Sequence, residues 1–155
     1  MSLQSPAESL ATHTAAERLV FFYENLTPAN LHLIGDCYAP DARFKDPFNE
    51  VRGVAAISQI FSHMFVNLDQ PRFKVTERLM QGRQAFLAWE FHFRMKRWRS
   101  GVDQCIQGGS LLRFDEQGRV DFHRDYWDTA EELYEKLPVL GSLMRWLRKS
   151  GSAAT

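Results

Sequence analysis

The chain has 155 residues, of which 45% are hydrophobic and 25% charged, as is typical of one ordinary globular domain. Its 19 basic and 19 acidic side chains cancel, which argues against general attraction to nucleic acid or anionic membranes. No apolar stretch approaches the roughly 20 residues of a membrane span, and the first residues lack the pattern of a signal peptide. Cys37 and Cys105 form no paired motif, so we expect buried free thiols, a cytoplasmic location, and neither a disulfide framework nor a zinc site.

Three helices are expected in the first half of the chain. Residues 1–13 are small and polar and predict a flexible tail, followed by a single domain over residues 14–150. The first helix is expected from about residue 14 to residue 25. A second is expected to begin near Pro28, which suits the first turn of a helix, and to include Tyr38.

The pattern then changes from helical spacing to alternation. A short strand, "ARFKDP" (42–47), precedes a third helix that follows Gly53. Strand-like runs separated by turn residues are expected at 72–80, 84–97, 103–114 and 119–127. The run that begins Thr129-Ala130-Glu131-Glu132 has the form of a capping box and predicts a C-terminal helix. Helices followed by a meander predict an α+β fold, with one curved antiparallel sheet wrapped around three N-terminal helices.

The last predicted strand, "GRVDFHRDYWDT" (118–129), gathers polar and aromatic residues on one face. That face carries Asp121, His123, Asp125 and Trp127. Alternation alone favours a face that meets solvent. Trp127 favours a cavity, since an exposed indole is unusual, and the pairing of Asp125 with His123 is typical of an acid/base site.

The run "FLAWEFHFRM" (86–95) alternates in the same way. Its apolar face is expected to form the pocket wall and core and carries Leu87, Trp89, Phe91, Phe93 and Met95. Its polar face is expected to meet solvent or a second subunit, with His92 as a surface pairing residue rather than a catalyst. Gly108-Gly109 predicts a bulge or bend, and close approach of a ligand is the alternative.

Two segments resemble a known family. The stretch "YAPDARFKDPFNEVRGVAAISQIF" (38–61) resembles the segment that carries the catalytic aspartate in bacterial ketosteroid isomerases, and "LLRFDEQGRV" followed by "DYW" resembles that family's last hairpin. Element order and length resemble the wider nuclear transport factor 2-like superfamily, including the SnoaL-like polyketide cyclases. The resemblance covers about residues 15–137. It implies a cone-shaped roll around an apolar pocket, and a homodimer that forms through the sheet.

Carried over residue by residue, the isomerase pattern matches only in part. Asp46 falls on the general base, with a turn in which its carboxylate bonds its own backbone as the alternative. The isomerase oxyanion hole uses a tyrosine and a protonated aspartic acid. Those positions fall on Phe22, with Tyr23 one residue away, and on Ser110. Loss of an oxyanion donor typically costs about 10²–10³ in rate, so efficient ketosteroid isomerisation is not expected.

The SnoaL-like cyclases resemble the last strand better, because they use an aspartate in this part of the sheet as general acid/base, and Asp125 matches it best. On the same alignment His123, Asp125 and Trp127 point into the cone. The residues expected to act in catalysis are Asp46, His123 and Asp125. The residues expected to bind the ligand are Phe22, Tyr23, Tyr38, Phe61, Trp89, Phe91, Ser110 and Trp127.

Two functions remain open. The first is a cofactor-independent isomerase, aldol-type cyclase or dehydratase that moves protons on a hydrophobic carbonyl compound, with no metal. The second is a non-catalytic module that binds a lipid-like or polycyclic molecule, or a dimeric interaction domain, and the missing oxyanion donors favour it. Neither nucleic-acid binding nor stable membrane insertion is expected. "RMKRWR" (94–99) is interpreted as a hairpin tip, and "LMRWLRKS" (143–150) as packing over the cone mouth or against a second subunit.

Overall fold

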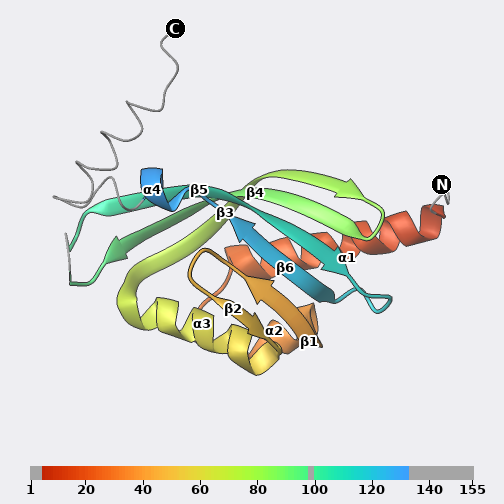
Figure 1. Ribbon diagram of the computed structural model, residues 1–155, viewed down its shortest axis with the longest axis horizontal. Helices are drawn as coiled ribbons and strands as arrows, with labels where there is room; N and C mark the ends of the chain where they lie inside the picture. Colours follow the sequence, from red (N-terminus) through yellow and green to blue (C-terminus); the bar gives the residue numbers. More distant parts are fainter. Residues whose placement is uncertain (1–4, 98–99, 133–155) are drawn as a thin grey trace, which may run out of the picture.

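The computed structural model describes residues 5–97 and 100–132. Helices α1, α2 and α3 lie on the same side of a curved six-stranded sheet (Figure 1). The helical elements are α1 (Pro6–Glu24), the short 3-10 helix η1 (Leu31–Leu33), α2 (Ile34–Cys37), α3 (Val54–Asn67) and α4 (Thr129–Glu132). The strands are β1 (Tyr38–Lys45), β2 (Glu50–Arg52), β3 (Leu68–Gln81), β4 (Gln84–Met95), β5 (Asp103–Phe114) and β6 (Val120–Tyr126). The predicted α+β roll is confirmed.

Helix α1 begins earlier than predicted. The Ser5 side chain accepts a hydrogen bond from the Glu8 amide at 3.2 Å, and the Glu8 carboxylate accepts one from the Ser5 amide at 3.0 Å. This capping box, with Pro6 in the first turn, starts the helix. The prediction of a flexible tail over residues 1–13 is therefore wrong from Ser5 onward. The spacing of Ser5 and Glu8 is the sequence pattern of a capping box and indicates this start, whereas the polar composition of the stretch indicates a tail.

The second predicted helix is shorter than expected, and Tyr38 does not belong to it. The chain forms only the turn of η1 and the four residues of α2 before Tyr38 opens strand β1. The Tyr38 side chain is completely buried. As the first residue of a strand, Tyr38 extends under the sheet rather than along a helix face, and this places its hydroxyl beside β6.

The sheet has the order β2-β1-β6-β5-β4-β3 and is mixed rather than purely antiparallel. Strands β1 and β6 run parallel, and the chain between them, which includes α3 and β3 to β5, makes the crossover that a parallel pair requires. Their register sets Phe44 beside His123. Every other neighbouring pair is antiparallel, as predicted.

The bulge, one of the two forms expected at Gly108-Gly109, is absent. The β4–β5 ladder keeps its register through both glycines, and the irregularities of the long hairpin lie instead in β3. The glycines make room for aromatic rings. A Cβ on Gly108 would lie 2.5 Å from the Trp89 ring on the inner face, and one on Gly109 would overlap the Phe86 ring on the outer face. The absent side chains let both rings lie flat on the strand.

The main core lies between the helices and the inner face of the sheet. Its completely buried members include Ala16, Tyr38, Ala42, Ile57, Leu112 and Val120. None of the described helices is long and apolar enough to span a bilayer. Helix α4 begins at Thr129 as predicted, and the rest of the expected C-terminal helix, including "LMRWLRKS", lies outside the described residues.

Candidate active site

Strand β6 points its functional residues inward. His123 is 3% exposed, and the Asp125 side chain is 18% exposed. Tyr126, the next residue, is 46% exposed on the opposite face. Residues two apart on a strand share a face, so the imidazole and the carboxylate both lie under the sheet. The resemblance implied this inward direction, whereas alternation alone favoured a face that meets solvent.

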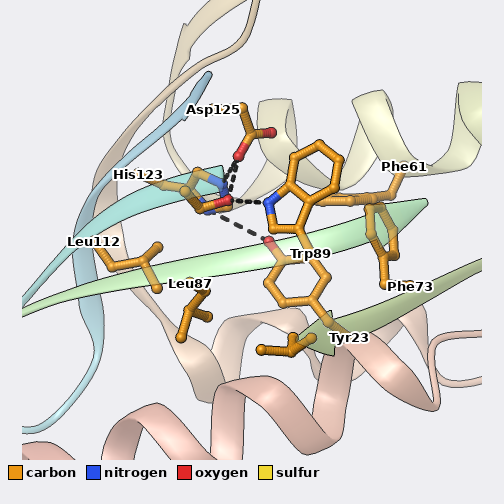
Figure 2. A pocket seen from close by; sticks show the side chains of 10 residues that line it. Tyr23, Phe61, Phe73, Leu87, Trp89, Leu112, His123 and Asp125 are labelled. Atoms are coloured by element: carbon orange, nitrogen blue, oxygen red, sulfur yellow. Dashed lines mark hydrogen bonds and ion pairs between the residues drawn. The ribbon is translucent and has the colours of Figure 1, made fainter. Parts of the chain in front are cut away.

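Asp125 is the centre of a hydrogen-bond network at the inner face (Figure 2). Its Oδ1 atom accepts a bond of 2.5 Å from Ser110 Oγ and lies 2.6 Å from His123 Nε2. Ser110 in turn accepts a bond of 2.8 Å from Trp89 Nε1. Sheet register produces this arrangement, because Ser110 on β5 pairs directly with Asp125 on β6. Within the described residues, Asp125 Oδ2 receives no hydrogen bond.

His123 continues the network away from Asp125. Its Nδ1 lies 2.6 Å from the Tyr38 hydroxyl and 3.4 Å from that of Tyr23, and the two tyrosine hydroxyls are also bonded to each other. Burial raises the pKa of Tyr23 well above the ordinary value, although its bond with Tyr38 opposes the shift. Burial likewise raises the pKa of Tyr38. Both therefore remain protonated phenols at neutral pH.

The donors around His123 fix its place beside Asp125. When Tyr38 donates to Nδ1, the Nε2 proton of the imidazole points at Asp125. Tyr23 bonds the Tyr38 hydroxyl and lies within 3.4 Å of the same ring nitrogen.

Two connected spaces meet at Asp125. A chamber of about 30 Å³, large enough for one or two waters, lies beside Tyr23, Ser110 and His123. A wider groove of about 700 Å³ opens outward along α3 and the β1–β2 turn. Residues that line both spaces are Phe61, Phe73, Trp89 and Asp125. The groove volume falls within the roughly 300–1,000 Å³ of small-molecule sites, and its wall is mainly aromatic and apolar.

Asp46 lies at the rim of this groove, and its carboxylate is used by a turn. It accepts bonds from the amides of Phe48 and Asn49 at 2.7 and 2.6 Å, and two more from Asn49 Nδ2 at 3.1 and 3.0 Å. The geometry corresponds to the turn alternative given above. The turn presents Phe48, whose ring meets Trp127 edge-on at 5.6 Å. Asp46 thus supports the rim, and its catalytic role stays a prediction.

The predicted ligand-binding residues separate into two groups. Phe61, Trp89, Phe91 and Trp127 line the groove, and Tyr23 and Ser110 line the chamber. Phe22 and Tyr38 line neither space. Phe22 packs edge-on against the Tyr23 ring within the core, and Tyr38 acts on the site only through its bond with His123.

Sequence reasoning missed part of the wall. Phe73 and Val75 line the chamber from β3, where they alternate with exposed neighbours. Phe73 also stacks on Phe91 with ring centroids 4.5 Å apart. The same alternation that identified the β4 wall could have identified these two residues. Phe44, at 4.6 Å from the His123 ring, depended on the parallel β1–β6 pairing and had no local signal.

A family model described as a SnoaL-like domain matches residues 20–123, which is more than half of the chain. The chain belongs to this family. The match ends two residues before Asp125, so it does not include that carboxylate. No curated protein sequence matches this SnoaL-like chain closely enough to define a relative.

Solved structures confirm the fold of this SnoaL-like protein. An LEH-like epoxide hydrolase from M. tuberculosis shares 16% identity with a TM-score of 0.67, and the match covers 98% of this chain and 100% of that one. A candidate SnoaL-like polyketide cyclase from Jannaschia sp. CCS1 shares 14% with a TM-score of 0.69, over 84% and 94% of the two chains. An NTF2-like protein of unknown function from Burkholderia pseudomallei shares 16% with a TM-score of 0.67, over 78% and 93%. At these identities the likeness shows the nuclear transport factor 2-like fold alone.

Proposed function

We propose that this SnoaL-like protein is a cofactor-independent acid/base enzyme that acts on a mostly apolar carbonyl compound. One observation carries the proposal: the Asp125 carboxylate stands where the groove meets the chamber, with one oxygen held by Ser110 and His123 and the other without a bond from the described residues. A fixed carboxylate at the end of an aromatic groove is suited to removing a proton from a carbon that the groove positions.

The reaction begins with transfer of a proton from the carbon α to the carbonyl onto Asp125 Oδ2. The electron pair of the broken C–H bond moves into the enolate. Asp125 then returns the proton to another carbon, which gives isomerisation, or the enolate carbon attacks a second carbonyl, whose oxygen takes the proton and completes an aldol ring closure. Ser110 and His123 hold Oδ1 throughout, so only the other oxygen exchanges the proton.

His123, Tyr38 and Tyr23 are positioning residues in this scheme. They do not face the groove, and they reach the substrate only through Asp125. The two hydroxyls contact His123 at Nδ1, and His123 in turn holds Asp125 Oδ1. Because the Ser110 proton is already given to Asp125, no strong donor among residues 5–97 and 100–132 is reserved for the enolate oxygen. We therefore expect the modest acceleration of about 10²–10⁴ that acid/base catalysis alone supplies.

The aromatic wall defines the substrate class. Phe61, Phe91, Trp89 and Trp127 offer ring faces and edges, and apolar side chains outnumber polar ones along the groove. A polycyclic or aryl-substituted ketone would stack on these rings and present its reactive carbon to Asp125. Non-catalytic binding of such a molecule is the second candidate function, favoured by the absence of a reserved oxyanion donor among the described residues.

The test is exchange of carbon-bound hydrogen in D₂O, followed by proton NMR with a panel of cyclic enones and diketones of increasing ring number. Wild-type protein should catalyse exchange at the α carbon, and Asp125→Asn should lose about 10²–10⁴ of the rate. Asp121→Asn is the matched control, because Asp121 lies on the same strand, pairs with Arg113 at 2.9 Å and lines neither space.

Binding is followed in parallel by tryptophan fluorescence. If Asp125→Asn binds a compound as wild type does but no longer exchanges it, the enzyme is supported. If a compound binds and neither protein exchanges it, the binding module is the correct function. Exchange that survives Asp125→Asn and disappears in Asp46→Asn would move the base to the rim.

We also propose that the homodimer implied by the resemblance forms through the outer face of the sheet. Phe86 and Tyr126 are exposed there, on strands β4 and β6. Such rings gain most from contact with another apolar surface. Sedimentation velocity measures the assembly, and a monomer at all accessible concentrations would contradict it.

A further inference from the structure

The outer face of the sheet carries a second cluster of chemically active side chains, on the side opposite the groove. Glu90 and His92 are two residues apart on β4 and share this face, because they alternate with Trp89 and Phe91 of the inner wall. Cys105 on β5 pairs directly with His92. Strand pairing thus brings together a carboxylate, an imidazole and a thiol, although 13 residues separate the cysteine from the histidine in the sequence.

The donor atoms of these three side chains converge. Glu90 Oε2 lies 2.9 Å from His92 Nε2, and Cys105 Sγ lies 3.9 Å from the same nitrogen. All three donor atoms lie within 4.8 Å of one another. In the single chain the Glu90 and His92 side chains are 29% and 31% exposed, so the cluster is partly sheltered and still reachable from water.

Glu90 and Cys105 contact the same nitrogen of the His92 ring, and this distinguishes a metal site from a nucleophilic triad. In a nucleophilic triad the thiol and the carboxylate bind opposite nitrogens of the imidazole, so that one activates the other through the ring. Here both Glu90 and Cys105 approach Nε2. The arrangement therefore does not suit a relay, whereas three donor atoms within 4.8 Å of one another are close enough to share one metal ion.

We propose that Glu90, His92 and Cys105 form a binding site for a divalent cation of the zinc type, completed by a water molecule. Thiolate sulfur, imidazole nitrogen and carboxylate oxygen are the ligands that zinc uses, at about 2.0–2.3 Å. Tetrahedral placement at those lengths sets donors roughly 3.3–3.6 Å apart. The 2.9 and 3.9 Å separations bracket that range, so small side-chain rotations would close the site.

Charge sets the expected affinity. A thiolate and a carboxylate together balance a divalent cation, and binding releases the proton of the thiol. Arg72 and Lys74 on β3 pair with His92 and Glu90 and add positive charge to the same face. We therefore expect a weaker site than a four-ligand structural zinc centre. The three ligands line neither the groove nor the chamber, so this inference is independent of the proposed enzyme activity.

The test uses the full chain after dialysis against a chelator, titrated with Co²⁺ and followed by absorption spectroscopy. We expect one ion per chain, a thiolate-to-cobalt charge-transfer band in the near ultraviolet, and displacement of cobalt by Zn²⁺. Cys105→Ser should abolish the band. His92→Gln and Glu90→Gln should weaken binding by more than the roughly 10–100-fold typical of outer-shell substitutions.

Two matched controls use the same chemistry elsewhere in the chain. His32→Gln alters an exposed histidine that contacts the Ala29 carbonyl, and Cys37→Ala removes the buried thiol of the core. Both should keep wild-type cobalt binding, and circular dichroism should show that every variant is folded. Absence of a thiolate band in wild type would overturn the proposal. So would a band that survives Cys105→Ser or disappears in Cys37→Ala.

Discussion

The inner and outer faces of strands β4, β5 and β6 carry similar polar residues in opposite surroundings. On the inner face, Asp125 and His123 are satisfied by one another and by neutral donors that sheet register fixes in place. On the outer face, Asp103 is paired with Arg94 across the ladder. Asp121, predicted on the same face as His123 and Asp125, instead pairs with Arg113, because the β5–β6 register shifts between Arg113 and Phe114. Water reaches both partners of each pair. Inner-face partners cannot be replaced by solvent, whereas outer-face partners can.

The two faces also shift pKa values in opposite ways. On the outer face, Arg94 lowers the pKa of Asp103 through a hydrogen bond of 2.7 Å and its charge. On the inner face, burial raises the pKa of Tyr23 and Tyr38, because a buried phenolate would lose its hydration. Burial on the inner face thus favours the uncharged form of the tyrosine donors. We expect substitutions there to lower the free energy of unfolding more than equivalent substitutions on the outer face.

The largest difference is expected between two adjacent glycines. Gly108→Ala would push a methyl group against Trp89, which is 9% exposed and held at Nε1 by Ser110. Overpacking of this kind costs about 1–3 kcal/mol in free energy of unfolding. Gly109→Ala would push against Phe86 instead, which is 37% exposed and can turn toward solvent. We expect that variant to remain within about 0.5 kcal/mol of wild type.

Urea unfolding followed by tryptophan fluorescence measures both changes. Gly108→Ala should also alter the native emission, because Trp89 must leave its bond with Ser110. Equal losses at the two positions would mean that the outer ring is as tightly held as the inner one, and the contrast between the faces would not hold.

A smaller effect is expected from the loss of one buried hydroxyl. Tyr38→Phe removes the 2.6 Å partner of His123 Nδ1, and Tyr23, at 3.4 Å, can replace it only in part. An incompletely satisfied buried group costs about 1–2 kcal/mol in free energy of unfolding. Tyr126→Phe is the matched change on the outer face, where the side chain is 46% exposed, and should cost less than about 0.5 kcal/mol. Calorimetric or urea unfolding measures both variants. A larger loss of stability in Tyr126→Phe than in Tyr38→Phe would contradict the prediction.

Much of the fold was predictable because its signals are local. Turn residues and alternation identified β4, β5 and β6 within one or two residues of their ends. The parallel pairing of β1 with β6 was not predictable in this way, because it depends on contacts between distant parts of the chain. The role of Gly108-Gly109 was not predictable for a related reason. Glycine suits both a bulge and the close packing of an aromatic ring from the neighbouring strand, and only the strand register shows which of the two is present.

In the candidate site, too, features with a local sequence signal were predictable and features that depend on strand pairing were not. The inward direction of His123 and Asp125 followed from strand period once the resemblance chose the buried face. Their partners were less predictable, because Tyr38 lies 85 residues from His123 in the sequence. Ser110 lies only 15 residues from Asp125, but its contact depends on the exact register of the β5–β6 hairpin. Asp46 matched a motif, yet its carboxylate closes a turn, because Asn49 and the following amides lie within reach of it. A matching residue type thus predicted a position more reliably than a role.

The smallest effect expected is the response of stability to alkaline pH. The raised pKa of Tyr23 and Tyr38 means that the unfolded chain, whose tyrosines titrate near 10, loses these protons before the folded chain does. Their contribution to stability is therefore complete below about pH 10 and is lost as the pH rises above it. Tyr38→Phe removes one of the two groups, so its free energy of unfolding should fall less steeply than that of wild type, by on the order of 1 kcal/mol over the first pH unit above 10. Urea unfolding of both proteins across this range isolates the tyrosine contribution, because all other titrating groups are shared. Parallel curves for the two proteins would show that the Tyr38 hydroxyl ionises in the folded state as readily as in water.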